Sequence, residues 1–415
     1  MKNNLRKFYV LRLTIVMVWL LNCTTILLAQ WVNTNGPGNN LIAYSLTSSG
    51  TNLFAGTYSG VYRSSNGGTN WIAVNNGLPA IRVYAVVFSG EYLLAGTLLG
   101  GAGIFRTTNN GANWTASNNG LTNLNVTTIA VFGNYLFAGT LSGNFRSTNN
   151  GDSWTTIGST GSAAYDFVMS GSNLFAGTYG SGVYRSTNNG TSWTAVNNGL
   201  PNLSLYTLLA SEGNLYAGLE YTGVGSFYRS SNSGMNWISI NSGIPESRGH
   251  SLFSYGSNII AGTYDSDIFI SANQGTDWTS ISEGFSNASA LTFFIYNNNL
   301  FAGTYGDGVW RRPLSEIISV QNISTENPDQ FDLKQNYPNP FNPVTYIEFS
   351  IPKQYNVKIT VYDSQGKEVA DLLNERLSAG SFRVDFDGTG FSSGIYFYKM
   401  ETEDFVQTKS MVLLK

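Results

Sequence analysis

Few residues of this 415-residue chain are suited to acid–base, metal or nucleophilic chemistry. It contains one histidine, His250, and one cysteine, Cys23. A histidine-based metal site or a serine–histidine–aspartate triad would depend wholly on His250. Because Cys23 lies in the predicted leader, we expect no disulfide or thiolate chemistry in the mature protein. The sequence predicts neither a bound metal nor a cofactor.

Carboxylates are the remaining catalytic candidates, and they would suit hydrolysis of a glycosidic bond. That reaction needs two carboxyl groups flanking the bond, about 5–9.5 Å apart. The best pair is Asp265 or Asp267 with Asp307, because their loops belong to neighbouring units of a repeat described below. Acids in surface loops are usually only solvated, and these Gly-, Ser- and Tyr-rich loops give no sign of a desolvated pocket. We therefore expect recognition rather than catalysis.

Tyrosines are the better candidates for binding. Tyr58, Tyr179, Tyr264 and Tyr305 each follow an Ala-Gly-Thr triplet. Their flat faces would stack on sugar rings if they surround a channel mouth; alternatively, they fill the channel as packing. Nucleic acid is not an expected ligand, because the net charge is −3 and no lysine occurs between Gln30 and Arg312.

An internal repeat must position these residues. Its second strand carries an apolar-Ala-Gly signature in seven copies, and its turn carries the pattern S/T-x-N-x-G-x-x-W in six. Successive tryptophans are 39–44 residues apart. A period near forty residues with four short strands is typical of a propeller blade. The repeated positions are Asn66, Asn109, Asn149, Asn188, Asn232, Asn273, Trp31, Trp71, Trp114, Trp154, Trp193, Trp237 and Trp278.

The missing seventh turn pattern is explained at the N-terminus. Gln30–Pro37 matches the end of a repeat unit, whereas the last unit, Ala290–Arg312, stops after three strands. We therefore expect Trp31–Thr34 to supply the fourth strand of that last unit. Such a pairing would close seven blades into a ring and remove the exposed edges of an open array.

The S/T-x-N-x-G-x-x-W turns resemble the Asp-box, or BNR, repeats of sialidases, sortilin-like ectodomains and xyloglucanase-type glycosidases. This chain has Asn at the family's Asp position, and Asn still makes the same side-chain-to-backbone turn bonds. The resemblance implies a structural role for the boxes, away from the ligand face. A sialidase would need three arginines to bind the carboxylate of its substrate. Only Arg82 and Arg248 lie in suitable loops outside the repeated arginine position, so the sequence does not supply this arginine clamp. The repeated arginines are predicted to be structural: Arg63, Arg106, Arg146, Arg185 and Arg229.

The N-terminal segment Met1–Ala29 is predicted to be a secretory signal peptide. A basic start is followed by the apolar run Leu13–Leu21, and Ala29 is a plausible cleavage edge. The run is much shorter than the roughly 20 residues of a membrane span, which disfavours an uncleaved anchor. A lipoprotein signal at Cys23 is disfavoured by Asn22, where a small residue would be expected.

The C-terminal part is a separate module. Residues 313–330 are predicted to be a linker, and residues 331–415 show about six or seven alternating strands, as in a small β-sandwich. Gln335–Pro343, Ser393–Tyr396 and the closing Lys409–Lys415 resemble the C-terminal sorting domain of the type IX secretion system of Bacteroidetes-like bacteria. The resemblance implies export and surface attachment or release, with the secretion machinery as partner. The alternative is an Ig-like spacer with no address function.

The expected architecture is all-β: a seven-bladed β-propeller over residues 30–312, followed by a small Ig-like β-sandwich. The expected function is a secreted or cell-surface binding or adhesion protein that recognises glycan or another extracellular polymer. A glycoside hydrolase of the Asp-box type is the alternative, and a scaffold for a protein partner is a third possibility that sequence does not separate from the first.

Overall fold

The structure is a computed structural model that describes residues 30–34, 36–37, 41–220, 223, 225–256, 258–265, 267–285, 288–317, 321–324, 328–377 and 379–415. The predicted signal peptide at residues 1–29 lies outside them. In this part of the chain, strands dominate, and the one helical element is the short helix η1 (Leu314–Glu316). No helix within it is long and apolar enough to cross a membrane. The expected all-β class is therefore confirmed.

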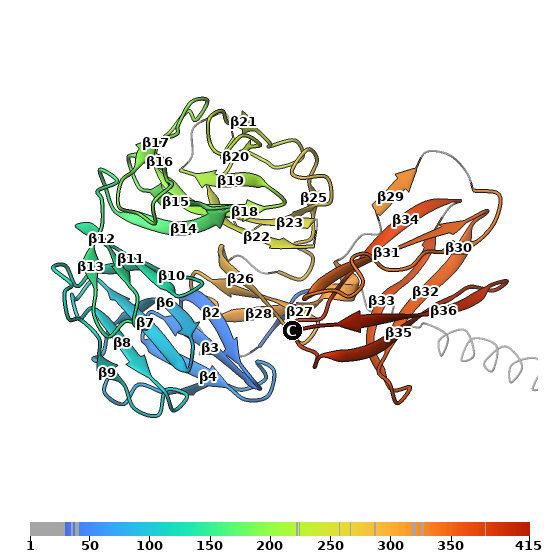
Figure 1. The fold of residues 1–415 in the computed structure, drawn as a ribbon, viewed down its shortest axis with the longest axis horizontal. Coiled ribbons are helices and arrows are strands. Elements are labelled where there is room, and N and C mark those ends of the chain that lie inside the picture. Colours follow the sequence, from blue (N-terminus) through green and yellow to red (C-terminus); the bar gives the residue numbers. More distant parts are fainter. Residues whose placement is uncertain are drawn as a thin grey trace, which may run out of the picture.

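Between Val32 and Pro313 the described strands form seven antiparallel sheets of four strands each, here called sheets 1 to 7 in chain order. Figure 1 shows them arranged around a common centre. The first, innermost strands are β2 (Ala43–Ser49), β6 (Arg82–Ser89), β10 (Val126–Phe132), β14 (Ala164–Ser170), β18 (Leu205–Ser211), β22 (Gly249–Tyr255) and β26 (Ala290–Tyr296). The second strands are β3 (Asn52–Thr57), β7 (Tyr92–Leu98), β11 (Tyr135–Thr140), β15 (Asn173–Thr178), β19 (Asn214–Leu219), β23 (Asn258–Thr263) and β27 (Asn299–Thr304).

The two outer strands of each sheet are shorter. The third strands are β4 (Gly60–Ser64), β8 (Ile104–Thr107), β12 (Gly143–Ser147), β16 (Gly182–Ser186), β20 (Phe227–Ser230), β24 (Ile268–Ser271) and β28 (Val309–Pro313). The fourth strands are β5 (Ile72–Ala73), β9 (Thr115–Ala116), β13 (Thr155–Thr156), β17 (Thr194–Ala195), β21 (Ile238–Ser239), β25 (Thr279–Ser280) and, for sheet 7, β1 (Val32–Asn33).

The Ala-Gly signature is explained by close contact between sheets. In β3 the five residues Leu53–Thr57 are all buried, because neighbouring sheets cover both faces. A Cβ atom added at Gly56 would lie 2.9 Å from the Val83 carbonyl oxygen of sheet 2. At Gly139 it would lie 2.4 Å from the Ala164 carbonyl oxygen of sheet 4. Only glycine allows the innermost strand of the next sheet to approach this closely.

The Asn-containing boxes hold the turns between third and fourth strands. The Ser64 hydroxyl accepts a hydrogen bond from the Gly68 amide at 2.9 Å, and the Asn66 side-chain oxygen accepts one from the Asn70 amide at 2.9 Å. Trp114 then crosses to the preceding sheet, where its indole N–H donates to the Val74 carbonyl at 2.7 Å. Each box thus both closes its own hairpin and joins two sheets.

Sheet 7 combines strand β1, from the start of the chain segment that forms the ring, with three strands from its end, as the sequence predicted. Strand β1 pairs with β28 in antiparallel register, with Val32 opposite Arg311. Trp31 is only 2% exposed, and its indole N–H donates to the Ile281 carbonyl at 2.8 Å. Strand β26 packs against β2, so the innermost strands form a closed cycle. The Arg311 guanidinium also donates to the Gly67 carbonyl of sheet 1 at 3.1 Å.

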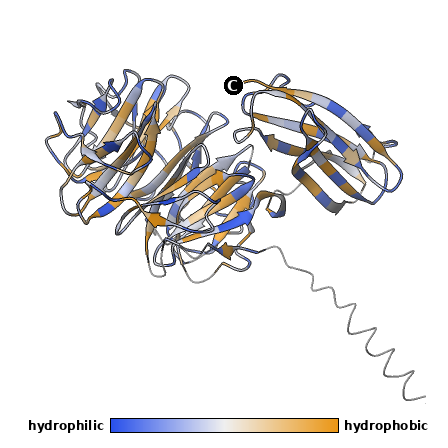
Figure 2. Ribbon diagram, turned by 90° about the horizontal axis from the view of Figure 1, so that it is seen from below, coloured by the Kyte–Doolittle hydropathy of each residue, from blue (hydrophilic) through white to orange (hydrophobic). Residues whose placement is uncertain are grey.

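The tail forms two more four-stranded sheets around one core cluster. Hydrophobic and hydrophilic residues alternate along these strands, as the banding in Figure 2 shows. In β31 (Val344–Ile351) every second residue is buried. One sheet has the order β29 (Gln321–Ser324), β34 (Gly380–Asp387), β31 (Val344–Ile351), β30 (Asp332–Leu333). The other has the order β33 (Glu368–Leu377), β32 (Tyr355–Tyr362), β35 (Gly394–Glu401), β36 (Val406–Leu413). Because β29 lies within residues 313–330, the predicted linker contributes an edge strand to the tail.

The tail lies beside the ring of sheets (Figure 1) and contacts one end of it. The backbone amide of Asp387 donates to the Tyr255 hydroxyl at 3.2 Å. Two clefts between the parts are lined by turns that join first and second strands, at Gly50, Glu212, Gly256 and Asn297. These turns lie at the same end as the boxes, so the tail leaves the opposite end uncovered.

Candidate functional site

A cavity of about 620 Å³ occupies the centre of the ring, at the end away from the boxes. Each innermost strand approaches it through a β-bulge. In sheet 1, Ala43 pairs with Thr57 but Ser45 pairs with Gly56, so Tyr44 is left without a partner residue. A bulge re-aims the extra side chain, here towards the central cavity. The seven equivalent bulge residues all line the cavity: Tyr44, Tyr84, Thr127, Tyr165, Tyr206, His250 and Leu291.

The four tyrosines predicted to bind ligand surround this cavity at its rim. Tyr58, Tyr179, Tyr264 and Tyr305 follow the second strands and are 42–55% exposed. Their amides are anchored at equivalent places; that of Tyr179, for example, donates to the Ala163 carbonyl at 3.2 Å. Tyr179 and Tyr305 line the cavity directly. The predicted stacking residues therefore gather at one mouth, beside bulge residues that were not among the predicted binding residues.

Five aromatic rings of sheets 4 to 6 form a continuous arc around part of this mouth. Centroid separations are 5.8 Å for Tyr165–Tyr179 and 5.8 Å for Tyr179–Tyr206. Tyr206 stacks on His250 at 4.6 Å, with 13° between the planes. His250 lies 6.2 Å from Tyr264. The arc thus offers several ring faces and edges to a long, flat ligand.

Glu220 bonds to several side chains of the arc and holds them in place. It occupies the repeat position that holds a rim tyrosine in sheets 1, 4, 6 and 7. Its carboxylate accepts hydrogen bonds from the hydroxyls of Tyr206 at 2.5 Å and Tyr179 at 3.2 Å, and it pairs with Arg248 Nε at 2.6 Å. The Arg248 guanidinium also covers the Tyr264 ring at 4.8 Å. Charge-assisted bonds of this kind hold side chains in one orientation before a ligand arrives.

Two members of the arc, His250 and Tyr206, are held in their neutral forms by their surroundings. Burial, together with the nearby Arg248 guanidinium, lowers the pKa of His250 to about 4, although Glu220 opposes the shift. Burial and the hydrogen bond to Glu220 raise the pKa of Tyr206 above its ordinary value. Neutral His250 and phenolic Tyr206 present apolar faces, which suits stacking better than acid–base chemistry.

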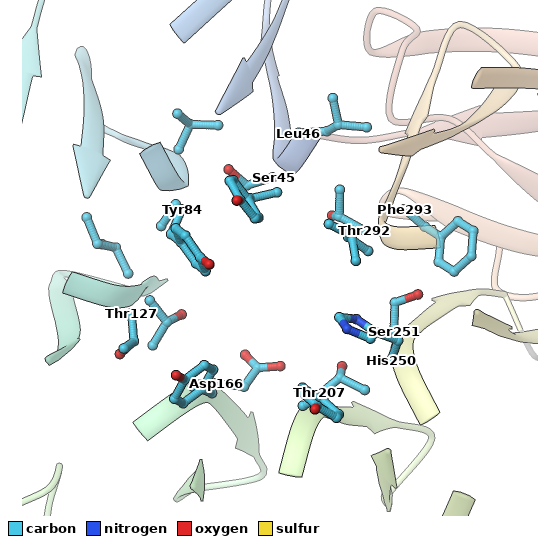
Figure 3. Close-up of a pocket in the computed structure, with 18 of the residues that line it drawn as sticks. Ser45, Leu46, Tyr84, Thr127, Asp166, Thr207, His250, Ser251, Thr292 and Phe293 are labelled. Atoms are coloured by element: carbon cyan, nitrogen blue, oxygen red, sulfur yellow. The ribbon is translucent and has the colours of Figure 1, made fainter. Parts of the chain in front are cut away.

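One carboxylate, that of Asp166, lines the cavity (Figure 3). Asp166 directly follows the bulge residue Tyr165, and hydroxyl residues such as Thr207 and Ser251 occupy the equivalent position in other sheets. Its carboxylate accepts a hydrogen bond from the Leu208 amide at 3.0 Å. The side chain is partly exposed to the cavity, but protein surrounds it. This burial raises the pKa of Asp166 to about 7.

We expect Asp166→Asn to stabilise the protein more at pH 8 than at pH 4. A folded-state pKa of about 7 means that the folded protein holds an extra proton between about pH 4 and 7, so the free energy of unfolding falls as pH rises through that window. The lowered pKa of His250 acts with the opposite sign between about pH 4 and 6.5 but is shared by both proteins. The difference in melting temperature between Asp166→Asn and the parent protein therefore reports the contribution of Asp166. A difference that does not change with pH would contradict the prediction.

The three carboxylates considered for hydrolysis do not line the cavity. Asp265 and Asp267 lie in the turn between β23 and β24, and Asp307 lies in the turn between β27 and β28. Asp166, which does line it, was not among the candidates. Among the described residues, no three His, Cys, Asp or Glu side chains are grouped to hold a metal ion.

The sequence contains a pattern that marks the seven bulge residues. Each bulge residue precedes the glycine of its Ala-Gly signature by twelve positions, as Tyr44 precedes Gly56 and His250 precedes Gly262. Aligning the units on this glycine would have placed four tyrosines and the one histidine in a single column. The bulge that turns this column inward depends on pairing with the second strand, which residue patterns alone did not reveal.

The box residues lie at the other end of the sheets. Four of the repeated arginines reach from one sheet to the next box: Arg63, Arg106, Arg146 and Arg229. Arg63 Nη1 donates to the Asn110 carbonyl at 3.3 Å, and Arg146 Nη1 donates to the Asn189 carbonyl at 3.0 Å. Arg106 forms an ion pair with Asp152 at 2.6 Å. These contacts hold neighbouring sheets together and lie away from the cavity mouth.

Comparison with known proteins gives two family matches. Residues 80–293, just over half of the chain, match the DUF6242 beta propeller domain, and residues 335–414 match the secretion system C-terminal sorting domain. The second match confirms the type IX sorting tail. Such a tail implies secretion or a cell-surface location in a Bacteroidetes-type bacterium. No curated protein matches the chain significantly.

Solved structures share the fold at low sequence identity. YCF48 from Cyanidioschyzon merolae has 14% identity and a TM-score of 0.52, covering 69% of this chain and 98% of its own. PorZ, a surface component of the type IX system of Porphyromonas gingivalis, has 13% identity and a TM-score of 0.53, covering 91% and 60%. The GH74 xyloglucanase from Xanthomonas campestris has 14% identity and a TM-score of 0.55, covering 78% and 59%. At these identities the likeness concerns the fold alone.

Proposed function

The chain belongs to the DUF6242 beta propeller family, and from this premise we propose that it is a seven-bladed propeller that binds an extracellular glycan at its uncovered mouth. The tail, a small β-sandwich in this proposal, directs the chain through the type IX system to the cell surface or the medium. The tail contacts the end of the ring that carries the boxes, so a ligand at the mouth would not compete with it.

The aromatic arc of Tyr165, Tyr179, Tyr206, His250 and Tyr264 carries this proposal. Sugar rings present flat C–H faces that pack on aromatic rings, and their hydroxyls suit the phenol edges and the Glu220–Arg248 pair at the rim. Because the arc is open to solvent on one side and several rings long, it fits a polymer better than a single sugar. The position of Asp265, Asp267 and Asp307 outside the cavity lining supports recognition rather than cleavage in this proposal.

We expect Tyr264→Ala and Tyr305→Ala each to weaken polysaccharide binding about twofold to twelvefold, because each loses an exposed ring contact of about 0.5–1.5 kcal/mol. Affinity for a polysaccharide panel is measured by calorimetry on the mature chain, with Tyr337→Ala, a 66% exposed tail residue, as the control. Asp307→Ala is expected to change affinity only modestly.

A reducing-sugar assay on the same panel separates binding from hydrolysis. Release of product that stops in Asp307→Ala or Asp265→Ala would favour a glycoside hydrolase instead. If no polysaccharide binds but an extracellular protein does, with loss in Tyr264→Ala, the protein-scaffold function replaces the glycan-binding one.

A further inference from the structure

Two arginines occupy the same repeat position at the mouth, two residues before the bulge residue. Arg82 precedes Tyr84, and Arg248 precedes His250. In sheet 6 the backbone fixes this position at the rim, since the Arg248 carbonyl accepts the amide of Tyr264 at 3.1 Å. The other five sheets have uncharged residues there: Ile42, Asn125, Ala163, Ser204 and Ser289. The two guanidinium groups therefore break the repeat in equivalent places on different sides of the ring.

The surroundings of the Arg82 and Arg248 guanidinium groups differ. Arg248 is neutralised by Glu220 at 2.6 Å. Arg82 Nη2 donates to the Tyr58 hydroxyl at 3.2 Å, and its guanidinium lies 4.3 Å from the centre of that ring. Among the described residues, no carboxylate lies within ion-pair distance of Arg82. Stacking on Tyr58 restrains the guanidinium while its remaining N–H groups stay available to a ligand.

Charge at the mouth is unevenly divided. The mouth-side loops of sheets 1 to 4 contain no Asp or Glu, and Arg82 begins strand β6 beside them. The one carboxylate among the cavity-lining residues of these four sheets is Asp166 of strand β14. The mouth-side loops of sheets 5 to 7 contain six acids: Glu220, Glu246, Asp265, Asp267, Glu283 and Asp307. A negatively charged group would be repelled by the loops of sheets 5 to 7 and attracted to Arg82. Salt limits these interactions to roughly 8–10 Å.

A stacking surface lies beside Arg82. Tyr44 and Tyr84 stack with their ring centres 4.0 Å apart and 16° between the planes. Both rings line the cavity. A sugar ring on this pair would bring an acidic substituent towards the Arg82 guanidinium, whose planar fork matches the oxygens of a carboxylate or sulfate.

We propose that Arg82, Tyr58 and the Tyr44–Tyr84 pair form a subsite for a negatively charged sugar unit, so that the polymer bound at the mouth is an acidic polysaccharide. This inference rests on the proposed glycan-binding function and names the class of glycan. The ligand unit would be a sugar that carries an oxyanion, either planar like a carboxylate or tetrahedral like a sulfate. Aromatic stacking beside the guanidinium favours a sugar over an acidic peptide.

The test compares matched acidic and neutral polymers on the full mature chain. Polygalacturonate is paired with its methyl ester to probe carboxylate, and dextran sulfate is paired with dextran to probe sulfate. We expect the parent protein to bind at least one acidic polymer about tenfold more tightly than its neutral match. Arg82→Gln should abolish this preference, and Arg82→Lys should retain part of it.

Arg185→Gln is the control, because it removes the same charge from the third strand of sheet 4, near a box. Loss of the preference in Arg185→Gln as well, or its persistence in Arg82→Gln, would overturn the subsite. Equal, Arg82-dependent binding of poly-L-glutamate would assign the site to acidic peptides instead. Binding of neutral and acidic polymers alike rejects this inference but leaves the proposed function standing, whereas no polysaccharide binding at all rejects both.

Discussion

Trp31→Ala will lower the free energy of unfolding by about 3–5 kcal/mol, the usual cost of removing a buried tryptophan. Trp31 is 2% exposed, contacts Phe285 edge to face at 5.5 Å and donates to the Ile281 carbonyl. It also precedes the two-residue strand β1, whose pairing with β28 closes the ring. Losing the side chain therefore weakens both the local core and the closure, and deleting residues 31–34 should cause aggregation through the exposed edge of sheet 7. Chemical denaturation of the mature chain measures the loss.

Val32→Ala is the matched control, since Val32 belongs to the same strand but is 48% exposed. Its expected effect is within about 0.5 kcal/mol. Trp114→Ala should resemble Trp31→Ala, because Trp114 is 4% exposed and makes the equivalent bond to Val74. Equal stability of the parent and the chain lacking residues 31–34 would show that this strand does not close the ring.

A chain ending at Ile317 will fold but stay in the periplasm of its native host. The cut removes the sorting domain together with β29, the edge strand that pairs with β34. It keeps Ile317, which is 4% exposed within the core of sheets 6 and 7. The Tyr255–Asp387 hydrogen bond is lost, which should cost the ring only about 0.5–1.5 kcal/mol. Quantitative detection in periplasmic, surface and medium fractions measures the result.

Tyr255→Phe in the full chain is the control for the lost contact between the two parts, and it should be exported normally. Fusion of residues 318–415 to a periplasmic reporter should carry the reporter outside the cell. Recovery of the truncated chain in the medium at parental levels would overturn the sorting role of the tail.

Local sequence sufficed for much of the fold. The Ala-Gly and Asn-Gly-Trp signatures encode a hairpin turn and a close approach that recur in each unit, so their spacing predicted the strands. The unmatched Trp31 predicted the closing strand, because a three-stranded last unit leaves an edge open. The alternating pattern after residue 330 predicted most tail strands, but β29 lies within the segment predicted to be a linker.

Tertiary structure decided the site. The column of Tyr44, Tyr84 and His250 faces the cavity only because a bulge in each first strand turns one residue inward, and that bulge depends on pairing with the second strand. The alternative catalytic carboxylates that the sequence offered were Asp265, Asp267 and Asp307. The carboxylate that lines the cavity is instead Asp166, because the register of the first strand decides which side chains face the cavity. The Glu220–Arg248 pair, and the contrast with Arg82, arise from residues of different sheets, whose distances depend on the closed ring rather than on any local pattern.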